Sequence, residues 1–446
     1  MLWHILKYLL SFSIPAFYRR VKIKNVHYLK NKFPAIITSN HPNAFMDPIL
    51  FSYLVYPPRV RYMARGDAFK PGVVSALLQS IGIVPIFRMQ DAGVEGLKKN
   101  NESYRVVYSL LKRNKKVMIF AEGICIQEKR LRPIKKGVPR LIYSAQEQMS
   151  DKDIQVIPVC LNYSNASQIG SDVFIYVGEP FSVKNQMQEY KQNPNPVMLQ
   201  MMNELYQKML PLIVHIENPN NDDLFEKSRA LLDEMICYKR NLHSKDPEHI
   251  FIVEKELSEF INYIAKNNQE QLIQFEAKIN SLYSIIKQYS VSIQCIIDFT
   301  YKSKFVFYLK FFLYSIIYPA YYLIYLIIGA FMYLPYILSH RLALRFSKNG
   351  KEFYASFFLA FSTFIFLFYY LLIYFALIQF LHPFYVLMFF IVSLSFIPLM
   401  HRWNEFRIYF NTMLKILKNK TFALNLSKNL EQILNEYEYL KKSSSN

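Results

Sequence analysis

The sequence predicts an α/β domain with a mixed sheet flanked by helices, followed by a helical region and by transmembrane helices near the C-terminus. Three observations predict this order. Short apolar runs alternate with helical stretches from about residue 21 to 185, apolar positions recur at helical spacing from about 186 to 300, and nearly uncharged stretches follow residue 311. We therefore expect a globular domain joined to membrane segments.

Composition and charge narrow the class of protein. The 446 residues are 52% hydrophobic with only 11 glycines, so the chain is too long for one compact core and too apolar to be soluble throughout. Its net charge of +20 suits a polyanion or an anionic membrane surface. The basic residues are spread along the chain and cluster beside the apolar stretches, which favours membrane lipids over nucleic acid as partners. The four scattered cysteines match no zinc spacing, so we expect a reducing, cytosol-facing domain without a metal.

The chain divides by composition into five segments. Residues 1–20 are expected to form an uncleaved interfacial helix, with Trp3 in the lipid headgroup layer and Arg19 and Arg20 near anionic lipid. An amphipathic helix packed on the domain is the alternative. The other segments are the α/β domain at 21–185, a helical region at 186–303, transmembrane segments at 304–402, and a basic cytoplasmic helix and tail at 403–446.

Within the α/β domain, the apolar runs predict strands and the stretches between them predict helices. The strand candidates are Ala35–Thr38, Val60–Ala64, Ile83–Ile86, Val117–Phe120, Ile154–Leu161 and Phe174–Val177. The helix candidates are Asp47–Tyr56, Val73–Ser80, Gly93–Arg113 and Gly137–Met149. Functional residues in such sheets collect at strand ends, where loops meet helices.

Three apolar stretches near the C-terminus are long enough, or nearly so, to cross a bilayer at about 20 residues per helix: Phe311–Leu338, Tyr354–Leu381 and Phe384–Met400. Pro319 and Pro335 are expected to break the first, and the second and third are expected to form a helical hairpin. Basic residues after the first and third stretches place both flanks in the cytoplasm. The first stretch should then enter and leave on one side, as a kinked re-entrant or paired element; a single crossing is the alternative.

His41 and Asp47 are the first candidate site. They follow the strand Ala35–Thr38, and a carboxylate that accepts the second ring proton of a histidine fixes its tautomer and steadies the imidazolium, as a general base requires. Six positions on a regular helix are about 240° apart, so the two side chains meet only if Pro42 and Asn43 make a turn. Asp47 is also expected to be the N-cap of the next helix. The alternative is that Asp47 only caps that helix and His41 is a surface turn residue.

Basic residues at strand ends are candidates for holding a phosphate. Arg88 closes the strand Ile83–Ile86, where its guanidinium can take two phosphate oxygens. Lys135 and Lys136 precede the helix Gly137–Met149 and are expected to contribute to the same site. The alternative for each is an exposed basic residue on a solvated surface.

Two further segments are expected to shape the site. Glu122 precedes Gly123, which allows a tight backbone turn after the strand Val117–Phe120; a simple helix-entry turn is the alternative. Pro158 cannot donate to a strand ladder, so an edge or a bulge is expected there. Cys125 is expected to be a small buried hydrophobe and not a nucleophile, because a base is already available.

In chain order, these segments resemble the four sequence blocks of the glycerolipid acyltransferase family, membrane-associated enzymes that acylate glycerol-3-phosphate and lysophosphatidic acid. The resemblance covers roughly residues 30 to 185. It implies an α/β acyltransferase domain in which the first block supplies the catalytic residues His41 and Asp47. It also implies that the phosphorylated acceptor is bound by Arg88, Glu122 and Gly123, and that Pro158 shapes the acyl-donor site.

The chain departs from the usual family pattern at two places. Five residues separate His41 from Asp47 instead of four, and Ala121 and Ile124 replace the usual proline and threonine around Glu-Gly. The wider spacing resembles the branch that includes fungal glycerol-3-phosphate and dihydroxyacetone-phosphate acyltransferases, which also carry C-terminal membrane helices.

Residues and resemblance together predict transfer of a fatty acyl group from acyl-CoA or acyl carrier protein to a hydroxyl of glycerol-3-phosphate or 1-acylglycerol-3-phosphate, without another cofactor. His41 would take the hydroxyl proton, Asp47 would hold the imidazolium, and Arg88 with Lys135 and Lys136 would hold the phosphate. One alternative is an acyltransferase for another lysolipid, such as an amino-acid lipid. Another is a membrane protein that keeps the fold without the chemistry.

Overall fold

The chain folds into two compact units. The computed structural model describes residues 2–55, 60–66, 82–87, 89–149, 151–348, 350–395 and 397–444, so the predicted helix Val73–Ser80 and the residue Arg88 lie outside the described residues. Unit 1 comprises Met1–Ile14, Val21–Ile213 and Phe346–Phe357. Unit 2 comprises Pro15–Arg20, Val214–Arg345 and Phe358–Asn446.

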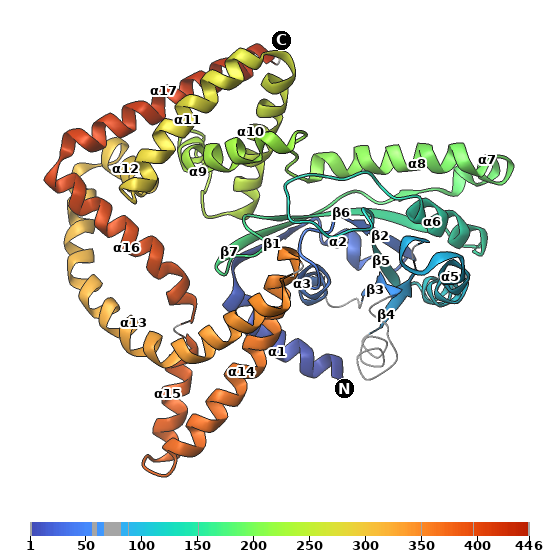
Figure 1. Cartoon of the computed structure of the whole chain (residues 1–446), viewed down its shortest axis with the longest axis horizontal. Coiled ribbons are helices and arrows are strands. Elements are labelled where there is room, and N and C mark those ends of the chain that lie inside the picture. The colour runs from blue at the N-terminus through green and yellow to red at the C-terminus, as the bar shows by residue number, and fades with distance from the viewer. Residues whose placement is uncertain are drawn as a thin grey trace. The chain divides into compact units, whose positions relative to one another are not determined.

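An eight-stranded mixed sheet forms the centre of unit 1 (Figure 1). Its strands lie in the order β1 (Tyr18–Lys24), β7 (Ser171–Val177), β6 (Gln155–Tyr163), β2 (Ala35–Ser39), β5 (Lys116–Phe120), β3 (Val60–Arg65) and β4 (Ile83–Ile86), and β8 (Phe181–Ser182) also pairs with β6. The pairs β2/β5, β2/β6, β3/β5 and β3/β4 are parallel, whereas β7 and β8 run antiparallel to β6. The predicted fold class is confirmed.

Each predicted strand corresponds to an observed strand, and the sheet has one long strand that the apolar runs do not reveal. β1, which has the sequence Tyr-Arg-Arg-Val-Lys-Ile-Lys, stands at an edge of the sheet and is only half-buried after Tyr18. Alternating basic side chains are common on edge strands, because charge there discourages pairing with another chain. In the sequence, the same basic residues suggest the flank of a membrane helix.

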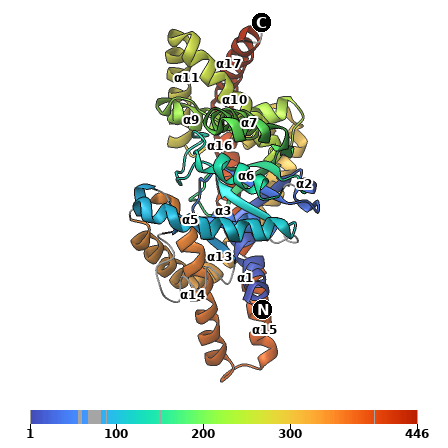
Figure 2. The same ribbon diagram turned by 90° about the vertical axis from the view of Figure 1, so that its right-hand side faces the viewer.

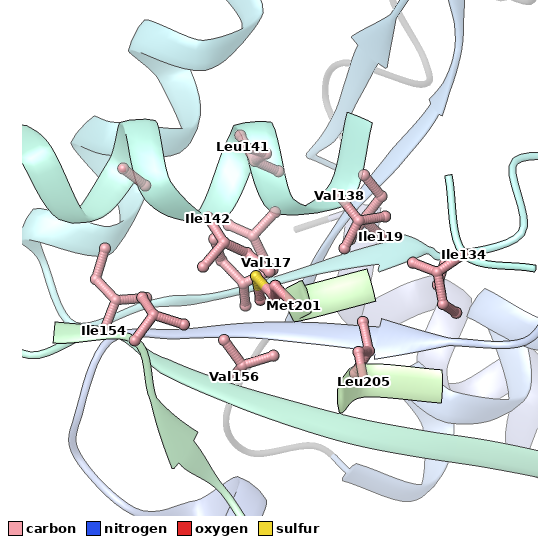
Figure 3. Packing of buried hydrophobic residues seen from close by; sticks show 14 of the residues in the cluster. Val117, Ile119, Ile134, Val138, Leu141, Ile142, Ile154, Val156, Met201 and Leu205 are labelled. Atoms are coloured by element: carbon pink, nitrogen blue, oxygen red, sulfur yellow. The ribbon is translucent and has the colours of Figure 1, made fainter. Parts of the chain in front are cut away.

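Some of the helices in this part of the chain contribute to one hydrophobic core with the sheet. The helices of this part of the chain are α1 (Leu2–Phe17), α2 (His27–Lys30), α3 (Met46–Val55), α5 (Met89–Lys112), α6 (Gly137–Glu147), α7 (Met187–Gln192) and α8 (Pro194–Met209). Leu141 of α6 and Met201 of α8 pack in one cluster with Val117 of β5 and Val156 of β6 (Figure 3). α8 therefore shares the core of unit 1, although the sequence suggests a separate helical region from residue 186.

Unit 2 contains a helical assembly built from both sides of the apolar segments. Its helices are α9 (Asp222–Lys239), α10 (Pro247–Asn267), α11 (Gln269–Gln288), α12 (Ile293–Tyr301) and α17 (Lys420–Ser444). The buried ring of Phe260 meets Phe275 and Tyr437 edge-on, with ring centroids 5.4 and 5.0 Å away. The C-terminal helix thus closes the core that α9 to α12 begin.

The apolar helices are α13 (Lys304–Phe346), α14 (Tyr354–Leu377) and α15 (Pro383–Ser395), followed by α16 (Ile397–Lys418). Among the described residues, Lys304–Phe346 and Lys351–Leu377 are long and apolar enough to cross a membrane. Pro319 and Pro335 lie inside a continuous α13, so the predicted break is wrong. The helix curves along its length instead (Figures 1 and 2), because an internal proline removes one hydrogen bond and bends a helix without having to end it.

The predicted helical hairpin is formed by α14 and α15. The hydroxyls of Tyr370 and Ser393 lie 3.0 Å apart across the two helices, and the rings of Tyr370 and Phe390 meet edge-on. Phe331 of α13 contacts the rings of Tyr369 in α14 and Phe389 in α15. The apolar helices therefore pack against one another through aromatic side chains.

Candidate active site

The loops that carry the candidate residues begin at one edge of the sheet. Ser39, the last residue of β2, lies opposite Phe120 of β5 and Val159 of β6 in parallel ladders. The Ala121 amide donates to the Ser39 carbonyl at 2.7 Å, and the Ile126 amide donates to the His41 carbonyl at 3.3 Å. The loop after β2 and the loop after β5 are therefore held together by their backbones.

His41 and Asp47 meet as the predicted turn requires. His41 Nδ1 lies 2.8 Å from Asp47 Oδ2, and the Asn43 amide donates to the same oxygen at 2.9 Å. The left-handed residue of the turn is Ala44, with φ of +36°. α3 begins at Met46, so Asp47 lies in its first turn and is not the predicted N-cap. Its carboxylate faces back toward the loop and accepts from groups outside the helix.

A third donor fixes the carboxylate of Asp47. The Tyr163 hydroxyl, at the end of β6, donates to Asp47 Oδ1 at 2.7 Å. The Asp47 side chain is fully buried, so each of its oxygens depends on these contacts. Three donors from His41, Asn43 and Tyr163 hold the carboxylate in one orientation. Tyr163 is missed by the sequence analysis, because it lies 116 positions from Asp47 and no local pattern connects them.

The ring of His41 is fixed on a second side. It stacks on Phe120, the last residue of β5, with ring centroids 3.7 Å apart and planes 13° apart. The His41 side chain keeps 19% of its surface exposed, in contrast to the buried Asp47. With Nδ1 directed at Asp47, Nε2 is the ring nitrogen available to a substrate. This arrangement suits a general base.

Glu122 lies at the junction of the two loops. Its carboxylate is 3% exposed and accepts from the Arg132 amide at 3.2 Å. Burial raises the pKa of Glu122 to about 7, although backbone hydrogen bonds from Arg132 and His41 and the charge of Arg132 oppose that rise. The side chain thus joins the loop that holds His41 to the segment that precedes α6.

Gly123 makes the tight turn that the sequence predicts. Its φ of +67° lies in the left-handed region, and a Cβ there would stand 3.1 Å from Lys135 Cγ. The Lys135 amide also donates to the Ala121 carbonyl at 2.9 Å. The backbone conformation therefore favours glycine, and a Cβ would in addition make the Lys135 side chain shift.

The basic candidates differ in their placement. Lys135 lies beside the Glu122–Gly123 turn and Lys136 precedes α6, and both side chains are exposed. Two further basic residues come from the same segment: Arg130 and Arg132 both pair with Glu128, at 2.7 and 2.5 Å. The cluster of charged residues at 128–132 is the sequence feature that could have identified Arg130 and Arg132.

A side chain of α5 holds the backbone that follows β4. The buried Asn100 side chain pairs with both polar backbone groups of Phe87: it accepts from the amide at 2.8 Å and donates to the carbonyl at 2.7 Å. Asn100 therefore fixes the end of β4. The predicted contact of Arg88 with a phosphate stays a prediction.

Pro158 lies in a central strand and not at an edge. β6 runs between β2 and β7, and Pro158 lies opposite Thr38 of β2. On the other side, the ladder changes from β8 at Val156 to β7 at Val159, and the Gly178 amide donates to the Pro158 carbonyl at 2.8 Å. The missing N–H of proline lies on the same side as this carbonyl, where the pairing of β6 passes from β8 to β7.

Cys125 supports the turn of the His41 loop, which we define as residues 40–46. The Ala44 amide donates to Cys125 Sγ at 3.0 Å. Burial, reinforced by the charge of Asp47, raises the pKa of the Cys125 thiol, so the thiol stays protonated and is a poor nucleophile. Within the described ranges, no three His, Cys, Asp or Glu side chains are grouped so as to hold a metal ion.

Comparison with known proteins shows what the first part of the chain is similar to. Residues 20–162 match the model of the acyltransferase family. No curated protein matches the chain. Among solved structures, the crystal structure of the 1-acyl-sn-glycerophosphate (LPA) acyltransferase PlsC from Thermotoga maritima is similar at 16% sequence identity, with a TM-score of 0.31, over 45% of this chain and 79% of that chain. The stretch that is similar to the acyltransferase family contains His41, Asp47 and Glu122.

Proposed function

We propose that this protein is a membrane-bound O-acyltransferase that moves a fatty acyl group from a thioester to a hydroxyl of glycerol-3-phosphate or 1-acylglycerol-3-phosphate. The observation that carries the proposal is the 2.8 Å contact between His41 Nδ1 and the buried Asp47 Oδ2 within the stretch that is similar to the acyltransferase family. The contact prepares a base at Nε2. Thioester aminolysis or hydrolysis would use the same base, so the choice of acceptor depends on the residues that surround the pair.

The reaction needs no covalent enzyme intermediate. His41 Nε2 takes the proton of the acceptor hydroxyl as its oxygen forms a bond to the thioester carbonyl carbon. The carbon–sulfur bond then breaks, and the imidazolium returns its proton to the leaving thiolate, so the acyl ester and a free thiol result. Asp47 stabilises the imidazolium between these steps. General-base catalysis of the kind assigned to His41 typically contributes about 10²- to 10⁴-fold. Orientation of both substrates supplies much of the rest.

Basic residues near the Glu122 turn favour an acceptor that carries a phosphate. Lys135 lies beside Gly123, and Arg130 and Arg132 come from the segment whose backbone Glu122 holds. We assign the phosphate to these residues together with Arg88 and Lys136. A buried carboxylate would repel a phosphate, so we assign Glu122 to the positioning of Arg132 and His41 and not to the phosphate itself.

The apolar helices support a location in a membrane. Only 6% and 17% of the most apolar windows of Lys304–Phe346 and Lys351–Leu377 are buried in the protein, so a bilayer is a suitable cover for the rest. The product carries long acyl chains, and each buried methylene contributes about 0.8 kcal/mol, so a membrane-held site avoids moving them through water. We place the acyltransferase unit on the cytoplasmic side, where the basic flanks belong.

An acceptor and donor panel tests the function. Membranes containing the wild-type protein or His41→Ala are offered glycerol-3-phosphate, 1-acylglycerol-3-phosphate, dihydroxyacetone phosphate or an amino-acid lysolipid, each with acyl-CoA or acyl carrier protein. Lipid mass spectrometry should show a His41-dependent product with one of the two glycerol phosphates. A product with the amino-acid lysolipid alone would move the enzyme to another acceptor class, and no product with any pair would contradict an enzymatic role.

A further inference from the structure

The short segment between the two long apolar helices belongs to the acyltransferase unit. α13 ends at Phe346 and α14 begins at Tyr354, and the helices themselves lie almost entirely in unit 2. Phe346–Phe357, however, is grouped with unit 1. We call these residues the linker. Its described part is a turn, a short helix at Lys351–Phe353 and the first residues of α14.

Ser356 of the linker contacts the backbone next to the catalytic pair. The Met46 amide donates to Ser356 Oγ at 3.1 Å, across 310 positions of sequence, and Ser356 is buried with 6% of its surface exposed. The same amide also donates to the Asn43 carbonyl at 2.8 Å, a shared bond of the kind common at helix termini. Met46 is the first residue of α3 and precedes Asp47, so the contact fixes the place where the His41 loop enters the helix.

An aromatic contact lies beside this hydrogen bond. The ring centroids of Phe45 and Phe353 lie 5.9 Å apart, and those of Phe353 and Phe357 lie 6.3 Å apart. Two consecutive residues of the His41 loop, Phe45 and Met46, thus contact two residues of the linker.

The turn between His41 and Asp47 requires such support. Ala44 adopts a left-handed conformation, which costs a non-glycine residue roughly 1–2 kcal/mol and persists only where surrounding contacts hold it. Cys125 holds the Ala44 amide from the Glu122 side of the loop. Ser356 and Phe353 hold the next two residues.

We propose that the linker helps to set the geometry of the active site and that Ser356 is a positioning residue. Through its hydrogen bond with the Met46 amide, Ser356 keeps the Asp47 carboxylate at hydrogen-bonding distance from His41. This proposal rests on the proposed function, because the reaction is the readout of the geometry. Ser356 touches neither His41 nor substrate in this account. It acts through the backbone of α3.

Three variants of α14 separate positioning from a general loss of structure. Ser356→Ala removes one of the two acceptors of the Met46 amide and should lower kcat about three- to tenfold, the range for one net hydrogen bond, with the acceptor KM unchanged within about twofold. Ser356→Thr keeps a hydroxyl and should recover most of that loss. Ser362→Ala is the matched control, because the Ser362 hydroxyl donates to Leu359 of its own helix and should leave kcat unchanged.

A chemical cross-link detects the contact between the His41 loop and the linker without an activity measurement. Phe45→Cys combined with Phe353→Cys, treated in intact membranes with a short bis-maleimide cross-linker, should give a cross-linked peptide pair in mass spectrometry, and neither single variant should give it. The pair is expected even in a His41→Ala background, where no turnover occurs.

The outcomes distinguish the two proposals. If His41→Ala abolishes turnover while Ser356→Ala matches Ser362→Ala, the function stands and the positioning role is wrong. If His41→Ala keeps full turnover, the proposed function fails, whatever Ser356 does. If Ser356→Thr fails to recover kcat while Ser356→Ala lowers it, the hydroxyl is not the feature that matters and the proposal is overturned. Absence of the cross-linked pair would overturn the contact itself.

Discussion

The Tyr163 hydroxyl donates to Asp47 Oδ1 at 2.7 Å, on the opposite oxygen of the carboxylate from the one that His41 contacts. Tyr163 at the end of β6 therefore orients the Asp47 carboxylate, which in turn orients the His41 ring. In the sequence, Asp47 has one visible partner, six residues away. In the folded chain, it has three, and this difference decides how firmly the imidazole is oriented.

Removing the Tyr163 hydroxyl should weaken catalysis without unfolding the protein. Tyr163→Phe keeps the ring of a nearly buried residue, so we expect kcat to fall about three- to tenfold while the acceptor KM stays within about twofold. Steady-state kinetics in membranes measures both. Tyr263→Phe, on an exposed ring of α10, is the control and should behave as wild type. A Tyr163→Phe enzyme with unchanged kcat would show that two donors suffice for Asp47.

Glu122→Gln should change how stability depends on pH. The pKa of Glu122 is raised from 4.5 to about 7 by burial, so the unfolded chain releases this proton at lower pH than the folded chain. The contribution of Glu122 to stability is therefore full below about pH 4.5 and is lost as the pH rises through about 7. Glutamine does not titrate, so the Tm of Glu122→Gln minus that of wild type should increase over this window and then level off. Thermal unfolding in detergent at pH 5 and pH 8 measures it; an equal difference at both values would contradict the raised pKa.

Gly123→Ala should destabilise the Glu122 turn. A left-handed φ costs a residue with a Cβ about 1–2 kcal/mol, and here the Cβ would also press on Lys135 Cγ. We expect a lower Tm and weaker binding of the phosphorylated acceptor. Gly137→Ala is the matched control, since nothing lies within 4 Å of the Cβ it would add. Equal Tm values for the two variants would contradict the preference for glycine at 123.

The contact between the linker and the His41 loop also predicts which side of the membrane the linker faces. Because the linker belongs to unit 1, residue 351 should face the same side of the membrane as Asp151, an exposed residue of that unit. Phe380 lies at the tip of the α14–α15 hairpin with 86% of its surface exposed and should face the other side. Cysteines placed singly at these positions in a Cys125→Ser background, labelled with an impermeant maleimide in sealed vesicles, test this.

Labelling of residue 351 and residue 151 from one side would place the end of α13 on the face of the membrane that carries unit 1. This is the side that the basic residues after the first apolar stretch predict. Labelling of these two positions from opposite sides would contradict the placement of the linker beside the His41 loop.

Local patterns in the sequence were sufficient for most of the sheet. Uninterrupted apolar runs such as Ala35–Ser39 are buried on both faces of a parallel sheet, so they stand out from the polar helices between them. β1 does not stand out in this way, because an edge strand exposes much of its surface and its basic residues also suit a membrane flank. The continuity of α13 through Pro319 and Pro335 is likewise hidden, since proline is compatible both with a helix end and with a bend.

The candidate site was predictable only where its residues are close in sequence. The His41–Asp47 contact and the Gly123 turn follow from spacing and from residue type. The contacts of Tyr163 with Asp47 and of Ser356 with Met46 join positions 116 and 310 residues apart, and tyrosine and serine are too common for their type to mark a site. Such partners are chosen by the pairing of β6 with β2 and by the packing of the linker, which only the fold supplies.

The most direct test of the account is the turnover of His41→Ala in membranes, measured with the preferred donor and glycerol-phosphate acceptor against wild type at equal protein levels. General-base catalysis predicts that kcat falls by about 10²-fold or more while Tm changes little, since His41 is partly exposed. A His41→Ala enzyme that keeps kcat within about twofold of wild type would contradict the proposed role of the His41–Asp47 pair.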